Sequence, residues 1–195
     1  MTTKPASIVT KERYVKGLTY EQFLAQAKVN LDRFKTYYET AKMDPDDVAF
    51  FMRAKAAGLD HVLALGEDWC PDVFRGLPQI AKFAEATGLD LRIFPRDTNL
   101  DIMNEFLKDG QFQSIPTLVF YTKDHQYIGH WIERPQIAYK QRPEIEAEVR
   151  KAMPGASDQD IRKAISPKVE ALYPAWQQAS VKEWRELVAS KLKVK

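Results

Sequence analysis

Cys70 is the only cysteine of the chain, and it lies in the stretch EDWCPDVFRG at residues 67–76. An apolar run, VLALG, precedes this stretch, and the pattern that follows predicts a helix beginning at Pro71. A thiol at a helix N-terminus meets unpaired backbone N–H groups and the positive end of the helix dipole, which both favour the thiolate. The residue types at this position therefore indicate nucleophilic thiol chemistry.

A single thiol limits that chemistry. A second cysteine three residues later would resolve a mixed disulfide, but Val73 occupies that position. A mixed disulfide formed at Cys70 must then be released by another molecule, such as glutathione, bacillithiol or a second protein. Oxidation to a sulfenic acid, as in a redox sensor, is the other reaction open to a lone thiol.

Charged side chains near the thiol act on its pKa in both directions. Asp68 and Asp72 disfavour the thiolate, and Arg75, about one helical turn along, offsets part of their effect. We expect the helix N-terminus to prevail and to lower the pKa of Cys70 modestly. Together with Glu67, the two aspartates predict a solvated acidic rim that selects basic or neutral partners.

The elements that position Cys70 follow from the hydrophobic pattern. Short apolar runs predict strands at 61–65, 89–94, 117–121 and 127–132, the last two joined as an antiparallel hairpin. A right-handed crossover makes the first two strands parallel, so Cys70 lies at the carboxyl end of the first strand, where ligands meet such sheets. Helices are expected at about 20–42, 45–57, 71–87, 97–108 and 135–152, and from Ser157 onward, where Pro167 and Pro174 kink or split the tail.

This order of elements and three local motifs resemble the thioredoxin fold. Residues 69–71, Trp-Cys-Pro, look like the entry of the thioredoxin active-site motif, with proline next to the cysteine as in glutaredoxins. Residues 114–117, Ser-Ile-Pro-Thr, look like the cis-proline segment of the family, and a polar turn with Lys123 follows. The resemblance covers about residues 60–150 and points to a single-cysteine, Trp-Cys-Pro-Asp branch.

The resemblance implies a monothiol thiol-disulfide oxidoreductase with Cys70 as its nucleophile. It also implies a substrate platform formed by Trp69, Pro71, Ile115 and Pro116. An iron–sulfur cluster bridged between two chains, as in monothiol glutaredoxins, is disfavoured because Pro-Asp-Val follows the cysteine in place of the Gly-Phe-Ser of those proteins.

Two further departures weaken the case for an ordinary dithiol reductase. Ala64 stands where thioredoxins carry a buried acid, and Glu133 aligns with the last-strand glycine that gives a partner's backbone room to approach. Whether Cys70 turns over a substrate is therefore left open. The alternative is a non-catalytic, protein-binding or redox-sensing module of the same fold.

Composition narrows the partners and the compartment. The 29 basic and 27 acidic side chains leave a net charge of +2, which is too small to argue for nucleic acid or an anionic membrane. The N-terminus lacks a signal-peptide pattern and no run of apolar residues is long enough to span a bilayer, so we expect a cytoplasmic protein. The three histidines lack ligand spacing, so no metal and no cofactor are expected. Expected partners are protein or low-molecular-weight thiols and disulfides of the glutathione kind, and a homodimer is left open.

Three regions are expected along the chain. A helical extension over residues 1–58 precedes a thioredoxin-like core at 59–153, and a helical tail at 154–195 follows it. Trp176 and Trp184 lie eight residues apart on the predicted tail helix, which predicts that the tail packs on the core as part of one compact domain.

Overall fold

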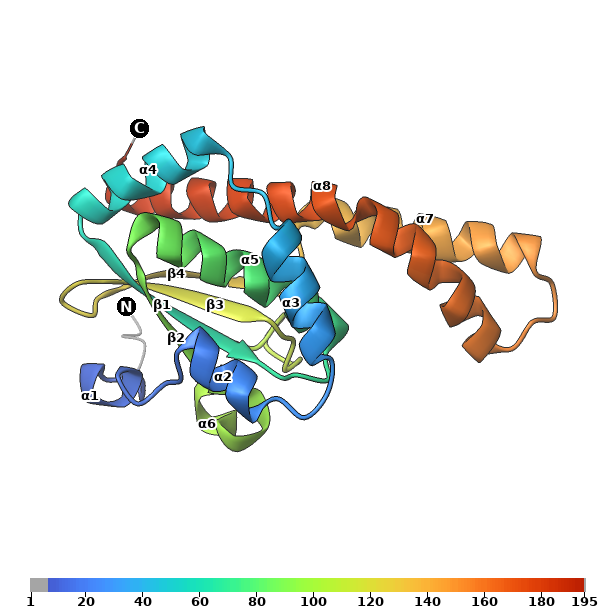
Figure 1. Ribbon diagram of the computed structural model, residues 1–195, viewed down its shortest axis with the longest axis horizontal. Coiled ribbons are helices and arrows are strands. Elements are labelled where there is room, and N and C mark those ends of the chain that lie inside the picture. Colours follow the sequence, from blue (N-terminus) through green and yellow to red (C-terminus); the bar gives the residue numbers. More distant parts are fainter. Residues whose placement is uncertain (1–6, 195) are drawn as a thin grey trace. The chain divides into compact units, whose positions relative to one another are not determined.

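A computed structural model describes residues 7–194 (Figure 1). Residues 1–6, which begin the expected N-terminal extension, and Lys195 lie outside the described residues. The described chain divides into two compact units. The first comprises residues 7–133 together with 184–194 and contains Cys70, and the second comprises residues 134–183.

A mixed sheet of four strands forms the centre of the first unit, in the order β2-β1-β3-β4 (Figure 1). β1 (Leu59–Gly66) is parallel to β2 (Asp90–Pro95) and antiparallel to β3 (Thr117–Thr122), which is antiparallel to β4 (Tyr127–Ile132). β1 is buried along nearly its whole length, as expected of a central strand with helices against it. The predicted α/β fold, a mixed sheet flanked by helices, is confirmed.

The helix that follows β1 has the predicted ends. α5 (Pro71–Thr87) carries proline at its first position and ends at Gly88, whose φ of 69° is the left-handed conformation that glycine adopts most easily. α4 (Pro45–Ala56) begins as predicted, with Asp44 as its cap. Both helices pack against β1.

The single helix predicted over residues 20–42 is wrong, because the chain breaks into α2 (Tyr20–Gln26) and α3 (Leu31–Thr40). The break contains Asn30, whose φ is 59°. The Asp68 carboxylate accepts hydrogen bonds from the backbone N–H groups of Lys28 and Val29, at 2.6 and 3.2 Å. This partner is distant in sequence, so helical periodicity does not reveal it.

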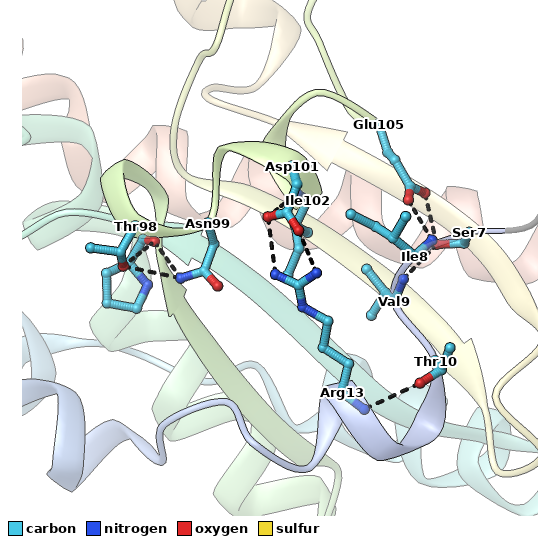
Figure 2. A network of polar contacts seen from close by, with 11 residues as sticks. Ser7, Ile8, Val9, Thr10, Arg13, Thr98, Asn99, Asp101, Ile102 and Glu105 are labelled. Carbon is cyan, nitrogen blue, oxygen red and sulfur yellow. Dashed lines mark hydrogen bonds and ion pairs between the residues drawn. The ribbon is translucent and has the colours of Figure 1, made fainter.

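The helix predicted over residues 97–108 is also wrong. Only η1 (Arg96–Thr98) and the four-residue α6 (Leu100–Met103) form there. The side chains of this segment instead hold the N-terminal segment, which includes α1 (Lys11–Tyr14). Figure 2 shows Arg13 paired with Asp101, and Glu105 accepting hydrogen bonds from the Ser7 hydroxyl and the Ile8 N–H.

The remaining helices are α7 (Gln136–Ala152), as predicted, and α8 (Asp158–Leu192). Pro167 and Pro174 do not split the tail, because α8 runs through both. Within the first unit, the end of α8 is anchored by Trp184, whose ring contacts those of Phe83 and Trp131 at centroid distances of 6.2 and 5.6 Å. The predicted packing of Trp184 is thus seen at this end of the helix.

Candidate functional site

Cys70 caps the N-terminus of α5. Its backbone is extended, its N–H donates to the Glu67 carbonyl at 3.2 Å, and its own carbonyl accepts the N–H of Phe74 at 3.1 Å. The Sγ atom lies 3.8 Å from the carbonyl oxygen of Ile115. The side chain is only 9% exposed, so the thiol is enclosed between the helix start and the segment before β3.

Strand pairing brings that segment to the thiol. Leu65 pairs with Thr117 across β1 and β3, which places residues 114–117 beside the end of β1 although they lie more than forty residues away in sequence. The Ile115–Pro116 peptide bond is cis, as the resemblance implied. Both residues are buried, and the Thr117 hydroxyl donates to the Ser114 carbonyl at 2.8 Å, which closes the turn.

Burial overturns the expected lowering of the cysteine pKa. Burial raises the pKa of the Cys70 thiol, because an anion loses hydration in an enclosed site. The N–H groups of Val73 and Asp72 at the helix start act in the opposite direction, while the negative charges of Asp72 and Glu133 add to the rise. The helix N-terminus was therefore identified correctly as a stabiliser of the thiolate, but burial outweighs it.

The charged residues predicted around the thiol do not form a solvated rim. Asp72 and Arg75 are both buried, and the Arg75 guanidinium lies 5.3 Å from the centroid of the Phe74 ring. Asp68 and Glu67 are half-buried, and Asp68 holds the loop between α2 and α3 as described above. These carboxylates are part of the folded framework of the site.

Glu133, which in the sequence is only a departure from the thioredoxin pattern, contacts the cis-proline segment. Its φ is 68°, a left-handed conformation that glycine adopts most easily. This φ agrees with the alignment of Glu133 to the last-strand glycine of thioredoxins. Its N–H donates to the Pro116 carbonyl at 2.7 Å, and its carboxylate pairs with the Lys108 ammonium at 2.9 Å. A charged pair therefore adjoins the cis-proline segment.

Trp69 is one of two exposed members of the predicted platform, with 48% of its surface accessible. The Arg96 guanidinium lies 5.0 Å from its ring centroid. Beside it opens a pocket of about 370 Å³. The pocket is lined by Trp69 and by residues of α2 and the loop after it, of the loop after β1, of the end of β2 and of η1: Phe23, Gln26, Ala27, Lys28, Glu67, Asp68, Pro95, Asp97 and Thr98.

A hydrogen bond that the sequence did not predict joins two acidic residues of the pocket lining, Glu67 and Asp97. The Glu67 carboxylate accepts the Asp97 N–H at 2.7 Å, and burial raises the pKa of Glu67. The sequence placed Asp97 only at the start of the helix predicted over 97–108, because nothing in the local pattern links it to the loop before Cys70. Pro71, the last platform residue, is exposed at the first position of α5.

The structure contains neither a metal-ligand cluster nor a membrane-spanning helix within residues 7–194. No three histidine, cysteine, aspartate or glutamate side chains gather there as metal ligands would. No helix in this part of the chain combines the length and the apolar character needed to cross a bilayer.

The comparisons with known proteins agree with this geometry. A family model described as thioredoxin matches residues 17–146, so the chain belongs to the thioredoxin family. The crystal structure of a protein of unknown function from Pseudomonas aeruginosa is similar, with 15% identity and a TM-score of 0.68 over 95% of this chain and 98% of that one. An HIV epitope-scaffold has 15% identity and a TM-score of 0.66, over 95% and 99% of the two chains. Such low identities show the shared fold alone, and no curated protein matches.

Proposed function

We propose that the protein is a cytoplasmic monothiol thiol-disulfide oxidoreductase with Cys70 as its nucleophile. The observation that carries the proposal is the placement of Sγ at the N-cap of α5, 3.8 Å from the Ile115 carbonyl that precedes the cis-proline. A cytoplasmic location fits because reducing compartments keep a lone thiol free.

The reaction requires two exchanges. The Cys70 thiolate attacks one sulfur of a disulfide, a bond forms between the two sulfurs, and the second sulfur leaves as a thiolate that takes up a proton. Val73 cannot resolve the mixed disulfide. A second thiol, of the glutathione kind or from a protein, then attacks the substrate sulfur of the mixed disulfide. A new disulfide forms between the second thiol and the substrate, the bond to Cys70 breaks, and Cys70 is released as a thiolate.

The surroundings of the thiol define the partner surface. Trp69 and Pro71 are exposed, whereas Ile115 and Pro116 are buried and the Ile115 carbonyl lies 3.8 Å from Sγ. The lining of the pocket beside Trp69 includes three acidic residues, Glu67, Asp68 and Asp97. This arrangement favours protein or small disulfide partners that are neutral or basic near the disulfide.

A second candidate function is a binding or redox-sensing module of the same fold. The observation that favours it is the buried thiol with its raised pKa, since disulfide exchange needs an accessible thiolate. Such a module would bind its partner through Trp69 and the adjoining pocket, and it would keep its affinity after Cys70→Ser.

The deciding experiment measures mixed-disulfide formation on the native protein. Wild type and Cys70→Ser are incubated with glutathione disulfide across the pH range, and adducts are counted by intact mass. The oxidoreductase proposal expects a single adduct on wild type, faster formation as pH rises, and release by reduced glutathione. If the adduct forms only after denaturation, the oxidoreductase proposal fails and the binding module stands.

An engineered resolving thiol gives an independent check. Val73→Cys restores a Cys-x-x-Cys pair at the start of α5, and glutathione disulfide supplies the oxidant. A site built for exchange will form the intramolecular disulfide without a lasting glutathione adduct. Val73→Ala is the matched control, because it makes a comparable change in size at this buried position without adding a thiol.

A further inference from the structure

A second pocket, of about 450 Å³, opens in the first unit among α2, α3 and α5. It shares no lining residue with the Cys70 site. Its lining comes from the start of α2, from α3 and from the C-terminal half of α5: Thr19, Tyr20, Glu21, Leu24, Lys35, Tyr38, Glu39, Ala81 and Glu85. Its volume lies in the range of about 300–1,000 Å³ that is usual for small-molecule sites.

Two stacked tyrosines form the aromatic part of the lining. The rings of Tyr20 and Tyr38 lie 5.6 Å apart with an angle of 21° between their planes. The Tyr38 hydroxyl donates to the Glu85 carboxylate, and this hydrogen bond is the main cause that raises the pKa of Tyr38. The negative charges of Glu85 and Glu21 raise it further, so both carboxylates act on the same hydroxyl.

The pocket carries an excess of negative charge. Glu21, Glu39 and Glu85 face it with three carboxylates, against the single ammonium of Lys35. Within residues 7–194, neither Glu21 nor Glu39 takes part in an ion pair. An organic cation that leaves water loses its hydration. Unpaired carboxylates beside aromatic ring faces can replace that hydration with electrostatic attraction.

A neighbouring lysine shows that the Tyr38 ring accepts a cation. The Lys82 ammonium lies 5.5 Å from the centroid of that ring and donates to the Tyr38 carbonyl at 3.1 Å. Leu24, Ala81 and the tyrosine rings supply hydrocarbon surface around the carboxylates. An inorganic cation would leave this surface unused, whereas an amine or guanidine on a hydrocarbon body uses both parts of the lining.

We propose that this pocket binds a small organic cation, an ammonium or guanidinium group carried on an aliphatic or aromatic body. The charged end lies among the carboxylates of Glu21, Glu39 and Glu85, and the hydrocarbon body lies against Tyr20, Tyr38 and Leu24. The site does not use the thiol, so the proposal is independent of disulfide exchange at Cys70.

The test compares a cation with its neutral counterpart on the full chain. Phenethylamine and 2-phenylethanol are titrated into ¹⁵N-labelled protein, and backbone chemical shifts are followed. The proposal expects saturable binding of the amine with shifts at residues of α2 and α3, and about tenfold weaker binding of the alcohol, a difference of roughly 1.4 kcal/mol. Equal binding of the two compounds, or no saturation by about 10 mM amine, overturns the proposal.

Variants locate the site and keep the test decisive. The double substitution Glu21→Gln with Glu39→Gln should weaken amine binding by about fivefold or more, since each carboxylate contributes a partly screened attraction. Glu144→Gln, an exposed glutamate on α7 outside the pocket, should bind like wild type. Cys70→Ser should also bind like wild type. Unchanged affinity of the double variant, with an unchanged melting temperature, places the amine elsewhere and overturns the proposal.

Discussion

The two ends of β1 hold buried and half-buried polar side chains in different ways. Beyond its carboxyl end, Cys70, Asp68 and Glu133 each face a specific polar partner: the Ile115 carbonyl, the N–H groups of Lys28 and Val29, and the Lys108 ammonium. At its amino end, rings pack on rings. His61 lies 4.8 Å from Tyr14 and 5.7 Å from His125, which stacks on Tyr121 at 4.4 Å, all between ring centroids.

This difference in contacts distinguishes the candidate site at the carboxyl end of β1 from the packed core at its amino end. At the amino end, the His61 ring nitrogens have no hydrogen-bond partner within residues 7–194, and the nearest carboxylate oxygens, of Asp60 and Asp90, are 3.4 and 3.9 Å away. Stacking alone holds the His61 ring, whereas the Tyr14 hydroxyl also bonds to the Val62 and Asp90 carbonyls and the His125 ring to the Val9 carbonyl. At the Cys70 end, directed hydrogen bonds fix the backbone around a buried thiol whose neighbour Trp69 lines an open pocket. The rings of Tyr14, His61, Tyr121 and His125 thus serve packing here.

The largest effect is expected from Tyr14, at the packed end. Tyr14→Ala should lower the free energy of unfolding by about 3–5 kcal/mol, because it removes a fully buried ring. Tyr14→Phe keeps the ring and loses only the hydroxyl that bonds to the Asp90 and Val62 carbonyls, at about 1 kcal/mol. Urea denaturation measures both. Losses of similar size for the two variants would show that hydrogen bonding dominates this end as well.

The next effect is expected at Asp68, where the Cys70 end depends on directed contacts. Asp68→Ala leaves the N–H groups of Lys28 and Val29 without their acceptor and should cost about 1–3 kcal/mol of unfolding free energy. Asp68→Asn retains an acceptor oxygen and should lose less. Hydrogen exchange at Lys28 and Val29 reports the break directly. Unchanged protection in the alanine variant would contradict the role assigned to this carboxylate.

A smaller, chemical effect is expected from the charges that act on the thiol. Asp72→Asn or Glu133→Gln removes a negative charge that raises the pKa of Cys70, so alkylation by iodoacetamide, which is uncharged, should speed up by about two- to fivefold near pH 8. Lys108→Gln removes the cation paired with Glu133 and is expected to slow it. If Asp72→Asn and Lys108→Gln shift the rate in the same direction, access to the thiol rather than its charge state sets reactivity.

The smallest effect is a pH dependence at the packed end. Burial lowers the pKa of His125, so the folded protein binds a proton less readily than the unfolded chain. Stability should therefore fall as pH drops below about 6.5, with a contribution below about 1 kcal/mol because the ring is partly exposed. His125→Asn suits the φ of 62° and should flatten this decline. An identical slope between pH 7 and 5 for both proteins would assign the decline to other groups.

The sequence predicted the local elements around Cys70 well. The helix from Pro71 to Thr87, its Gly88 terminus and the strand before it follow from proline, glycine and an unbroken apolar run, which act within a few residues. The predictions over 20–42 and 97–108 failed for the opposite reason. Asp68 in one case, and Arg13 and Ser7 in the other, contact those segments from far along the chain.

By itself, the sequence determined that one thiol, without a resolving partner, stands at the start of a helix next to a thioredoxin-like strand. Only the tertiary structure decided that this thiol is enclosed against the Ile115 carbonyl, so that its pKa rises. The physical reason is that a helix N-terminus is a property of neighbouring residues, whereas loss of hydration depends on every segment that packs around the sulfur. The pocket lined by Tyr20 and Tyr38 has the same origin, because α2, α3 and α5 meet there only in the folded chain.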